Sequence, residues 1–255
     1  MEKKLVSFPF RLTPDTKKKL GLIVLQADQT IETELRNILP KRCDLYHSRI
    51  PSEPQVTPET LKKMTKDLPA AAALFPTSLN LDAIAYACTS GATIIGPSQV
   101  ENIIKKVHRT AEVTDPISAA CDALQVLKAR RIGFVSPYIM SVSREIRNYF
   151  TSKGFEIFSA ISFDQELESV VASINEGDTL KAIEAAALEE VDAVFVSCTN
   201  LKSFSILDEA ERITGKPVLS SNQVLIWSML KKAKVSLSES ELNDCPGEIF
   251  TEKYY

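Results

Sequence analysis

The stretch IAYACTSG, residues 84–91, is an apolar, strand-like run that ends in a Cys-Thr pair. The same step recurs in the second half of the chain, where VFVSCTN spans residues 194–200. The two cysteines, Cys88 and Cys198, are far apart in sequence and therefore belong to different local units. If the two halves face each other, both thiols flank one cleft. That arrangement suits proton transfer at carbon from opposite faces of a ligand.

Strand-like and helix-like segments alternate along the chain. Short apolar runs predict buried strands, and apolar residues three and four positions apart predict helices. Strands separated by helical patterns indicate βαβ units and parallel sheets. The predicted strands span residues 22–25, 43–50, 81–88, 131–136, 155–163, 192–197 and 217–220, and the predicted helices span 31–39, 58–68, 143–152, 179–190, 204–213 and 224–230.

These elements form two series, one on each side of the middle of the chain. We therefore predict an α/β fold with two similar lobes, residues 1–115 and 116–221, each a parallel sheet flanked by helices. A nearly all-apolar helix within residues 222–234 is expected to be buried. The polar and acidic segment 235–255 is expected to be a loosely held tail.

Composition excludes several classes of partner and location. The net charge of −3 gives no basic field that would attract nucleic acid. No apolar stretch approaches the roughly 20 residues that cross a bilayer, and the apolar segment at residues 5–10 is too short for a secretory signal. The five cysteines are odd in number and widely spaced, which favours reduced thiols. We expect a cytoplasmic protein that does not bind membranes.

The two Cys-Thr steps lie where ligands bind in parallel sheets, beyond the carboxyl ends of strands. Small polar residues and an expected helix start follow each cysteine. Backbone N–H groups there can hold a carboxylate and are expected to lower the pKa of a thiol. A single cysteine in this position is usually a small buried hydrophobe. Two cysteines in matching contexts favour catalysis by Cys88 and Cys198.

Three other features follow predicted strands, and each has a simpler structural interpretation. Asp28 could face the same cleft, or it could cap the helix that begins near Thr30. Tyr138 could contact a ligand, or it could be a packing aromatic. The run Ser221-Asn222-Gln223 could reach the cleft, or it could cap the last helix.

Competing chemistries find little support in the sequence. The two histidines, His47 and His108, lack metal-ligand spacing with cysteines or carboxylates. There is no glycine-rich phosphate motif and no nucleophile elbow around a serine. The sequence therefore predicts chemistry without a metal or an organic cofactor.

Taken together, these motifs resemble the aspartate/glutamate racemase superfamily. The closest branch contains maleate cis–trans isomerases, arylmalonate decarboxylases and ectoine-utilisation protein A, the last being the most similar. The resemblance covers roughly residues 20–232. It rests on ACTSG at 87–91 with Ile95-Gly96, FVSCT at 195–199, TDP at 114–116, SPY at 136–138, and PVLSSNQ at 217–223 with Trp227.

The resemblance implies two pseudo-symmetric lobes with the active site between them. The C-terminal helix is expected to pack back on the first lobe, and related proteins are commonly dimers or larger homo-oligomers. It implies that Cys88 and Cys198 are the catalytic thiols. It further implies that a small carboxylate substrate is held by Tyr138 and by donors that follow each cysteine: Thr89, Ser90, Thr199 and Asn200.

One departure from this pattern concerns the substrate. Maleate isomerases carry an asparagine in the first loop that contacts a substrate carboxylate, whereas this chain has Asp28. A carboxylate would repel a dicarboxylate unless one of them were protonated. The aspartate therefore favours a racemase or epimerase of an amino- or hydroxy-dicarboxylic acid. Two alternatives stay open: cis–trans isomerisation through a covalent cysteine adduct, and a non-catalytic protein that binds small carboxylates.

Overall fold

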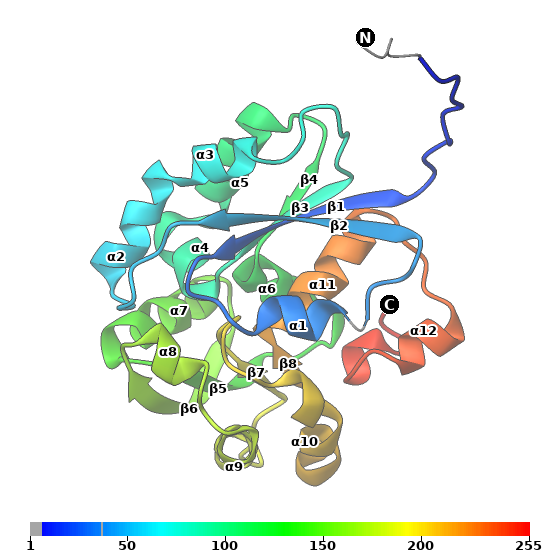
Figure 1. Cartoon of the computed structure of the whole chain (residues 1–255). Coiled ribbons are helices and arrows are strands. Elements are labelled where there is room, and N and C mark those ends of the chain that lie inside the picture. Colours follow the sequence, from blue (N-terminus) through cyan, green and yellow to red (C-terminus); the bar gives the residue numbers. More distant parts are fainter. Residues whose placement is uncertain (1–6, 37) are drawn as a thin grey trace.

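The computed structural model describes residues 7–36 and 38–255, so predictions for residues 1–6 and 37 lie outside it. Two four-stranded, all-parallel sheets form the molecule, with helices on their faces (Figure 1). The first sheet has the order β2-β1-β3-β4 and the second the matching order β6-β5-β7-β8. The strands are β1 Lys18–Leu25, β2 Cys43–Ile50, β3 Ala83–Ala87, β4 Glu112–Thr114, β5 Arg131–Tyr138, β6 Glu156–Gln165, β7 Ala193–Val196 and β8 Val218–Ser220.

The predicted α/β class with two parallel sheets is confirmed. The central strands β3 and β7 are buried along their whole length, as their continuous apolar sequences require when helices cover both faces of a sheet. The helices are α1 Ile31–Arg36, α2 Pro58–Lys63, α3 Leu68–Ala73, α4 Thr89–Ile95, α5 Pro97–Val107, α6 Pro116–Val126, α7 Met140–Ser152, α8 Glu168–Val171, α9 Glu176–Ala186, α10 Leu207–Thr214, α11 Ser221–Lys232 and α12 Glu239–Asn243. Among the described residues, none of the helices is long and apolar enough to span a membrane.

Helix α11 follows the last strand of the second sheet but packs against α6, β3 and β4. Residues 221–230 of this helix are all buried. A hydrogen bond of 2.8 Å joins the hydroxyls of Thr114, at the end of β4, and Ser228 in α11. The chain thus crosses twice between the two sheets. The predicted lobe limits, after residues 115 and 221, stay a prediction.

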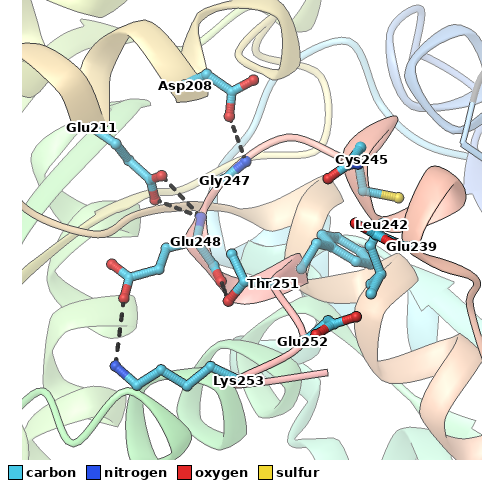
Figure 2. A pocket seen from close by; sticks show the side chains of 12 residues that line it. Asp208, Glu211, Glu239, Leu242, Cys245, Gly247, Glu248, Thr251, Glu252 and Lys253 are labelled. Atoms are coloured by element: carbon cyan, nitrogen blue, oxygen red, sulfur yellow. Dashed lines mark hydrogen bonds and ion pairs between the residues drawn. The ribbon is translucent and has the colours of Figure 1, made fainter.

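The expectation of a loosely held C-terminal tail is wrong. Ile249 and Phe250, in a short 3-10 helix Glu248–Phe250, are buried in the core. Figure 2 shows how the carboxylate of Glu211 accepts from the backbone N–H of Glu248, and how Asp208 accepts from Gly247. Acidic residues of this segment line a pocket between the segment and α10. None of the residues predicted for catalysis lines that pocket.

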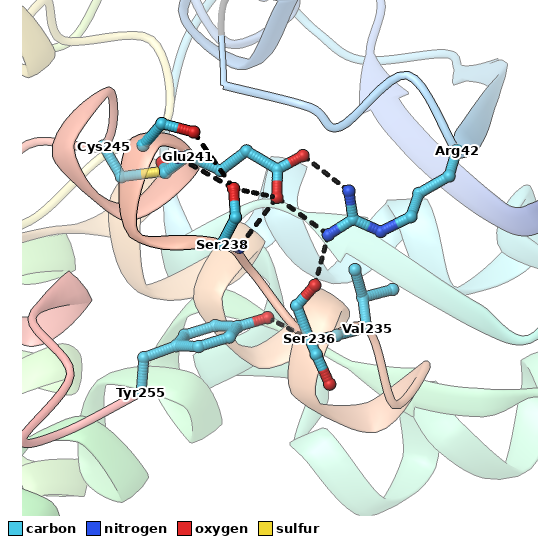
Figure 3. Close-up of polar contacts among 8 residues, drawn as sticks. Arg42, Val235, Ser236, Ser238, Glu241, Cys245 and Tyr255 are labelled. Carbon is cyan, nitrogen blue, oxygen red and sulfur yellow. Dashed lines mark hydrogen bonds and ion pairs between the residues drawn. The ribbon is translucent and has the colours of Figure 1, made fainter.

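A second anchor joins this segment to the loop before β2. The guanidinium of Arg42 makes a two-pronged contact with the carboxylate of Glu241, at 2.5 and 2.9 Å, and also donates to the Ser236 carbonyl (Figure 3). This pairing lowers the pKa of Glu241 to about 2. The ion pair is partly exposed to solvent.

Replacing Arg42 by alanine is expected to lower the free energy of unfolding by less than about 1 kcal/mol, because solvent screens an exposed ion pair. The contribution is present above the ordinary pKa of Glu241, 4.5, and is lost as the pH falls toward about 2. Urea unfolding of both proteins at pH 7 and at acidic pH measures it. A deficit that grows on acidification would contradict this assignment.

Candidate active site

The two predicted catalytic thiols lie just beyond matching strands, β3 and β7. Cys88 is the N-cap residue of α4, and its Sγ accepts from the Gly91 backbone N–H at 3.1 Å. The Ser90 hydroxyl lies 3.6 Å from the same sulfur. A Cβ added at Gly91 would meet Cys88 Sγ at 2.9 Å and the Tyr86 hydroxyl at 2.6 Å. Glycine at this position therefore leaves room for the thiol.

Cys198 occupies an unusual backbone conformation, with a φ of 120°. Non-glycine residues rarely adopt such angles, and they are often found at functional sites. Its backbone N–H donates to the Ser221 hydroxyl at 2.9 Å, and its Sγ accepts from the Asn200 backbone N–H at 3.2 Å. These contacts with the start of α11 and with the following loop fix the direction of the thiol.

Tyr138, at the end of β5, lies directly beside this second thiol. Its hydroxyl is 2.9 Å from Cys198 Sγ and donates to Glu168 Oε1 at 3.1 Å. Glu168 begins α8 and was missed by the sequence analysis. Its only sequence signal is its place shortly after a strand, because the neighbouring residues form no recognisable motif. Its Oε2 accepts from the Asn200 side-chain amide at 2.6 Å.

The two oxygens of the Asp28 carboxylate have different surroundings. Its Oδ1 accepts from the backbone N–H groups of Thr30 and Ile31, at 2.9 and 3.0 Å, which confirms the helix-capping role. Its Oδ2 is buried and has no hydrogen-bond partner among the described residues. Burial raises the pKa of this carboxyl, and the two backbone donors and the nearby Thr199 hydroxyl oppose the shift.

The remaining predicted residues tie the two halves of the molecule together. The hydroxyl of Thr89 lies 2.7 Å from that of Ser221, and Thr199 donates weakly to the Ala87 carbonyl at 3.4 Å. The Asn200 side-chain oxygen accepts from the Gln29 backbone N–H at 2.8 Å. The structure thus brings all eight predicted residues to the junction of the two sheets, although it places Thr89, Thr199 and Asn200 in contacts within the protein.

An isolated antiparallel bridge also joins the two halves of the molecule. It pairs Gln55, in the loop after β2, with Leu167, in the loop after β6. The backbone N–H of Val56 donates to the Glu166 carbonyl at 2.8 Å, and that of Glu168 donates to the Pro54 carbonyl at 3.1 Å. Equivalent loops of the two halves therefore meet next to Glu168. Both thiols are nearly excluded from solvent.

Burial also decides the electrostatics of the site. It raises the pKa of Cys88 to about 12 and raises the pKa of Cys198 well above its ordinary value, and the carboxylates of Glu168 and Asp28 add to both shifts. The expectation of thiols with a lowered pKa is therefore wrong for this closed arrangement. The N–H donors act in the predicted direction, but they are outweighed by the cost of a buried thiolate.

The two histidines lie elsewhere. His108 Nε2 contacts the Ala72 carbonyl at 2.8 Å, and His47, in β2, lies near Glu32. Ser220 and Gln223 form the capping box of α11, as the simpler interpretation of that run predicts, while the Ser221 hydroxyl reaches Cys198 and Thr89. Within residues 7–36 and 38–255, no group of three or more His, Cys, Asp or Glu residues is arranged to hold a metal ion.

Comparisons with known proteins agree with this architecture. The chain is 25% identical to the maleate isomerase of Alcaligenes faecalis over 229 residues, covering 84% of this chain and 90% of that protein. It is 27% identical to the maleate isomerase of Nocardia farcinica over 225 residues, with coverages of 84% and 89%. Its similarity to ectoine-utilisation protein A stays a prediction.

Solved structures share the fold. The maleate isomerase Iso from Pseudomonas putida S16 superposes with a TM-score of 0.82 at 21% identity, covering 93% of this chain and 99% of that one. Unliganded arylmalonate decarboxylase gives 0.76 at 16% identity, with coverages of 92% and 99%. The sequence pattern of the arylmalonate decarboxylase family matches residues 20–242. The chain therefore belongs to the arylmalonate decarboxylase family.

Proposed function

We propose that this protein is a cysteine-dependent isomerase that interconverts the cis and trans forms of a small unsaturated carboxylic acid. The observation that carries the proposal is the pair of buried thiols, Cys88 and Cys198, at the matching ends of β3 and β7. The maleate isomerases among the relatives support an isomerase. They favour cis–trans isomerisation, whereas the sequence analysis favours racemisation.

The proposed reaction uses one thiol as a nucleophile and the other as an acid. A thiolate adds to one carbon of the C=C bond, and the π electrons move toward the carboxylate at the other end. The opposite thiol protonates the second carbon, which leaves a single C–C bond that can rotate. That proton then returns to the opposite cysteine, which is now a thiolate. Cleavage of the bond between carbon and the nucleophilic sulfur restores the double bond in the other geometry. A mutant Nocardia farcinica maleate isomerase has been solved with a covalently bound succinylcysteine intermediate.

Incubation with maleate is expected to give fumarate and, on rapid acid quenching, a protein mass increased by one substrate molecule. Nuclear magnetic resonance detects the product, and intact-mass and peptide spectrometry locate the adduct at Cys88 or Cys198. Pre-treatment with a thiol-alkylating reagent serves as the control and should abolish both signals. Turnover without any trappable adduct would argue against the covalent route.

Racemisation of an amino- or hydroxy-dicarboxylic acid is the second candidate, and the unpartnered Oδ2 of Asp28 favours it. A buried carboxylate oxygen suits an ammonium or hydroxyl group better than another carboxylate. In this reaction one thiolate removes the α proton and the opposite thiol returns a proton to the other face. Solvent deuterium then enters the α position during turnover, whereas isomerisation of maleate does not require net exchange.

Several predictions from the sequence remain proposals. Tyr138, Thr89, Ser90, Thr199 and Asn200 are proposed to hold the substrate carboxylate once the cleft opens. A homo-oligomeric state, a cytoplasmic location and the lack of a cofactor also stay predictions. Ligand binding by an unmodified protein that turns over none of a broad panel of acids would favour the non-catalytic alternative.

A further inference from the structure

A continuous chain of hydrogen bonds runs from the second thiol to a buried carboxylate. Cys198 Sγ lies 2.9 Å from the Tyr138 hydroxyl, which lies 3.1 Å from Glu168 Oε1. A tyrosine hydroxyl carries only one proton. Since that proton is donated to the carboxylate, the tyrosine oxygen is left to accept from the S–H group of Cys198. The chain therefore has a direction, from the thiol through the tyrosine to the carboxylate.

The carboxylate is held rigidly in this position. The Asn200 side-chain amide donates to Glu168 Oε2 at 2.6 Å and to the Glu168 carbonyl at 3.1 Å. The orientation of that amide is set in turn, because its oxygen accepts from the Gln29 backbone N–H. Both oxygens of Glu168 thus accept hydrogen bonds, which favour the ionised form and oppose the rise in the pKa of Glu168 that burial causes. Its partners Tyr138 and Asn200 are uncharged, so the buried charge is costly as a purely structural element.

We infer that Glu168 is the base that takes the proton of Cys198, with Tyr138 as the relay between them. The S–H proton passes to the tyrosine oxygen while the tyrosine O–H proton passes to Glu168 Oε1. The products are a thiolate, a neutral tyrosine and a neutral carboxylic acid. The negative charge is moved within the buried cluster and none is added. Ionising the buried thiol by loss of its proton to solvent would instead add a second buried charge.

Among the described residues, the first thiol has no such relay to a carboxylate. Cys88 has the Gly91 N–H and the Ser90 hydroxyl as its hydrogen-bond partners, and the hydroxyl of the neighbouring Tyr86 donates to Met64 Sδ at 3.8 Å. Asp28 and Glu168 act on Cys88 through space and raise its pKa. Two other titratable groups act on the relay: Asp28, from the loop after β1, and Cys88, at the end of β3. This asymmetry makes Cys198 the thiol that is deprotonated before it reacts with substrate, and it leaves Cys88 protonated as the acid.

Replacing Glu168 by glutamine is expected to lower turnover at neutral pH by about 10²-fold, the usual contribution of a positioned base. The loss should shrink as the pH rises, because hydroxide can then deprotonate the thiol. Glu166→Gln, two residues earlier and exposed, is the matched control and should leave the pH–rate profile unchanged. An E168Q profile that matches the unmodified protein would overturn the relay.

A substrate-free titration separates this inference from the proposed function on which it rests. In E168Q, the glutamine amide must donate to the Tyr138 oxygen, so the tyrosine proton turns toward Cys198. We expect the pKa of Cys198 to fall, because a repelling charge is lost and a donor is gained. Ultraviolet thiolate absorbance in a Cys88→Ser background, minus that of the protein lacking both thiols, measures it. This readout holds even if maleate is not a substrate, and an unchanged or raised pKa contradicts the relay.

Tyr138→Phe provides a second test that keeps the carboxylate. It severs the relay, and it should lower kcat to about the same extent as E168Q, whereas loss of the proposed contact between Tyr138 and the substrate carboxylate acts on KM. The double variant should lose little more than either single variant, because both changes interrupt one chain. Circular dichroism establishes that each variant is folded. Losses that multiply in the double variant would show that the two residues act independently and would overturn the inference.

Discussion

Replacing either Cys88 or Cys198 by serine is expected to reduce turnover by at least about 10³-fold, since residues that act as one catalytic unit each carry most of the rate enhancement. A serine hydroxyl is a much weaker acid than a thiol, so neither the nucleophile nor the proton donor can be replaced by it. Steady-state kinetics of both single variants and the double variant measure the effect. The double variant should be little worse than the single variants.

Cys121→Ser is the matched control for this experiment. Cys121 is also buried, with 7% of its surface exposed. It lies in α6, and none of the hydrogen bonds described for Cys88 or Cys198 involves it. Its replacement should leave turnover within about twofold, because ordinary substitutions away from the chemistry act through stability. A Cys88 or Cys198 variant that behaves like Cys121→Ser would remove that thiol from the mechanism.

The two single variants should also differ from each other. If Glu168 deprotonates Cys198 through Tyr138, Cys198 is the thiolate that adds to the double bond and Cys88 is the acid. The Cys88→Ser variant then keeps the nucleophile and can still form an adduct, but it turns that adduct over slowly. The Cys198→Ser variant should form none. Intact-mass spectrometry after incubation with substrate therefore assigns the roles of the thiols, and an adduct found only in Cys198→Ser would reverse the assignment.

The fold could be predicted from local patterns because its central strands are short, continuous apolar runs. β3 and β7 lie at equivalent places in their sheets, which is why the two Cys-Thr steps proved to be equivalent in space. The parallel arrangement followed from the helices between strands. Local sequence therefore sufficed to bring Cys88 and Cys198 to one junction.

Glu168 could not be predicted in the same way, because its importance depends on contacts with distant parts of the chain. Tyr138 and Asn200 lie 30 and 32 residues away from it in sequence. Gly133, in β5, likewise has a role that depends on a distant contact. A Cβ there would come within 2.5 Å of the Ala186 carbonyl oxygen, so the glycine allows α9 to pack closely on β5.

The C-terminal segment shows a third kind of failure. Its polar and acidic composition suggested a tail, but composition does not reveal which residues already have partners. Glu241 pairs with Arg42, and the backbone of Glu248 is held by Glu211. Two adjacent apolar residues, Ile249 and Phe250, are enough to bury the end of the segment. Partner residues distant in sequence therefore decided whether this acidic segment is ordered.

A further carboxylate, that of the partly buried Glu34 in α1, joins the two halves. Its Oε1 accepts from the backbone N–H groups of Ser203 and Phe204, at 3.1 and 3.2 Å. Its Oε2 accepts from the Asn222 side-chain amide at 2.6 Å, and that amide also donates to the Thr199 carbonyl. One side chain of the first half thus satisfies three donors that belong to the second sheet's loops and to α11.

Replacing Glu34 by alanine is expected to lower the free energy of unfolding by about 3 kcal/mol or more, because each shielded donor left without an acceptor costs about 1–3 kcal/mol. Chemical denaturation at neutral pH measures the change. Glu32→Ala on the same helix is the control: Glu32 pairs with Arg49 at a partly exposed site, so its loss should cost less than about 1 kcal/mol. Equal losses for the two variants would contradict the role given to Glu34.

Glutamine at this position gives a test whose sign depends on pH. Burial raises the pKa of Glu34 from 4.5 to about 7, so the folded state holds the proton more tightly than the unfolded chain. The resulting stabilisation is complete below the unfolded pKa of 4.5 and is lost as the pH rises through about 7. The glutamine of Glu34→Gln does not titrate, so this variant lacks the pH-dependent stabilisation. Its stability deficit relative to the unmodified protein should therefore be largest at and below pH 4.5 and should shrink as the pH rises to about 7. A deficit that grows with pH would mean that the ionised carboxylate is the stabilising form.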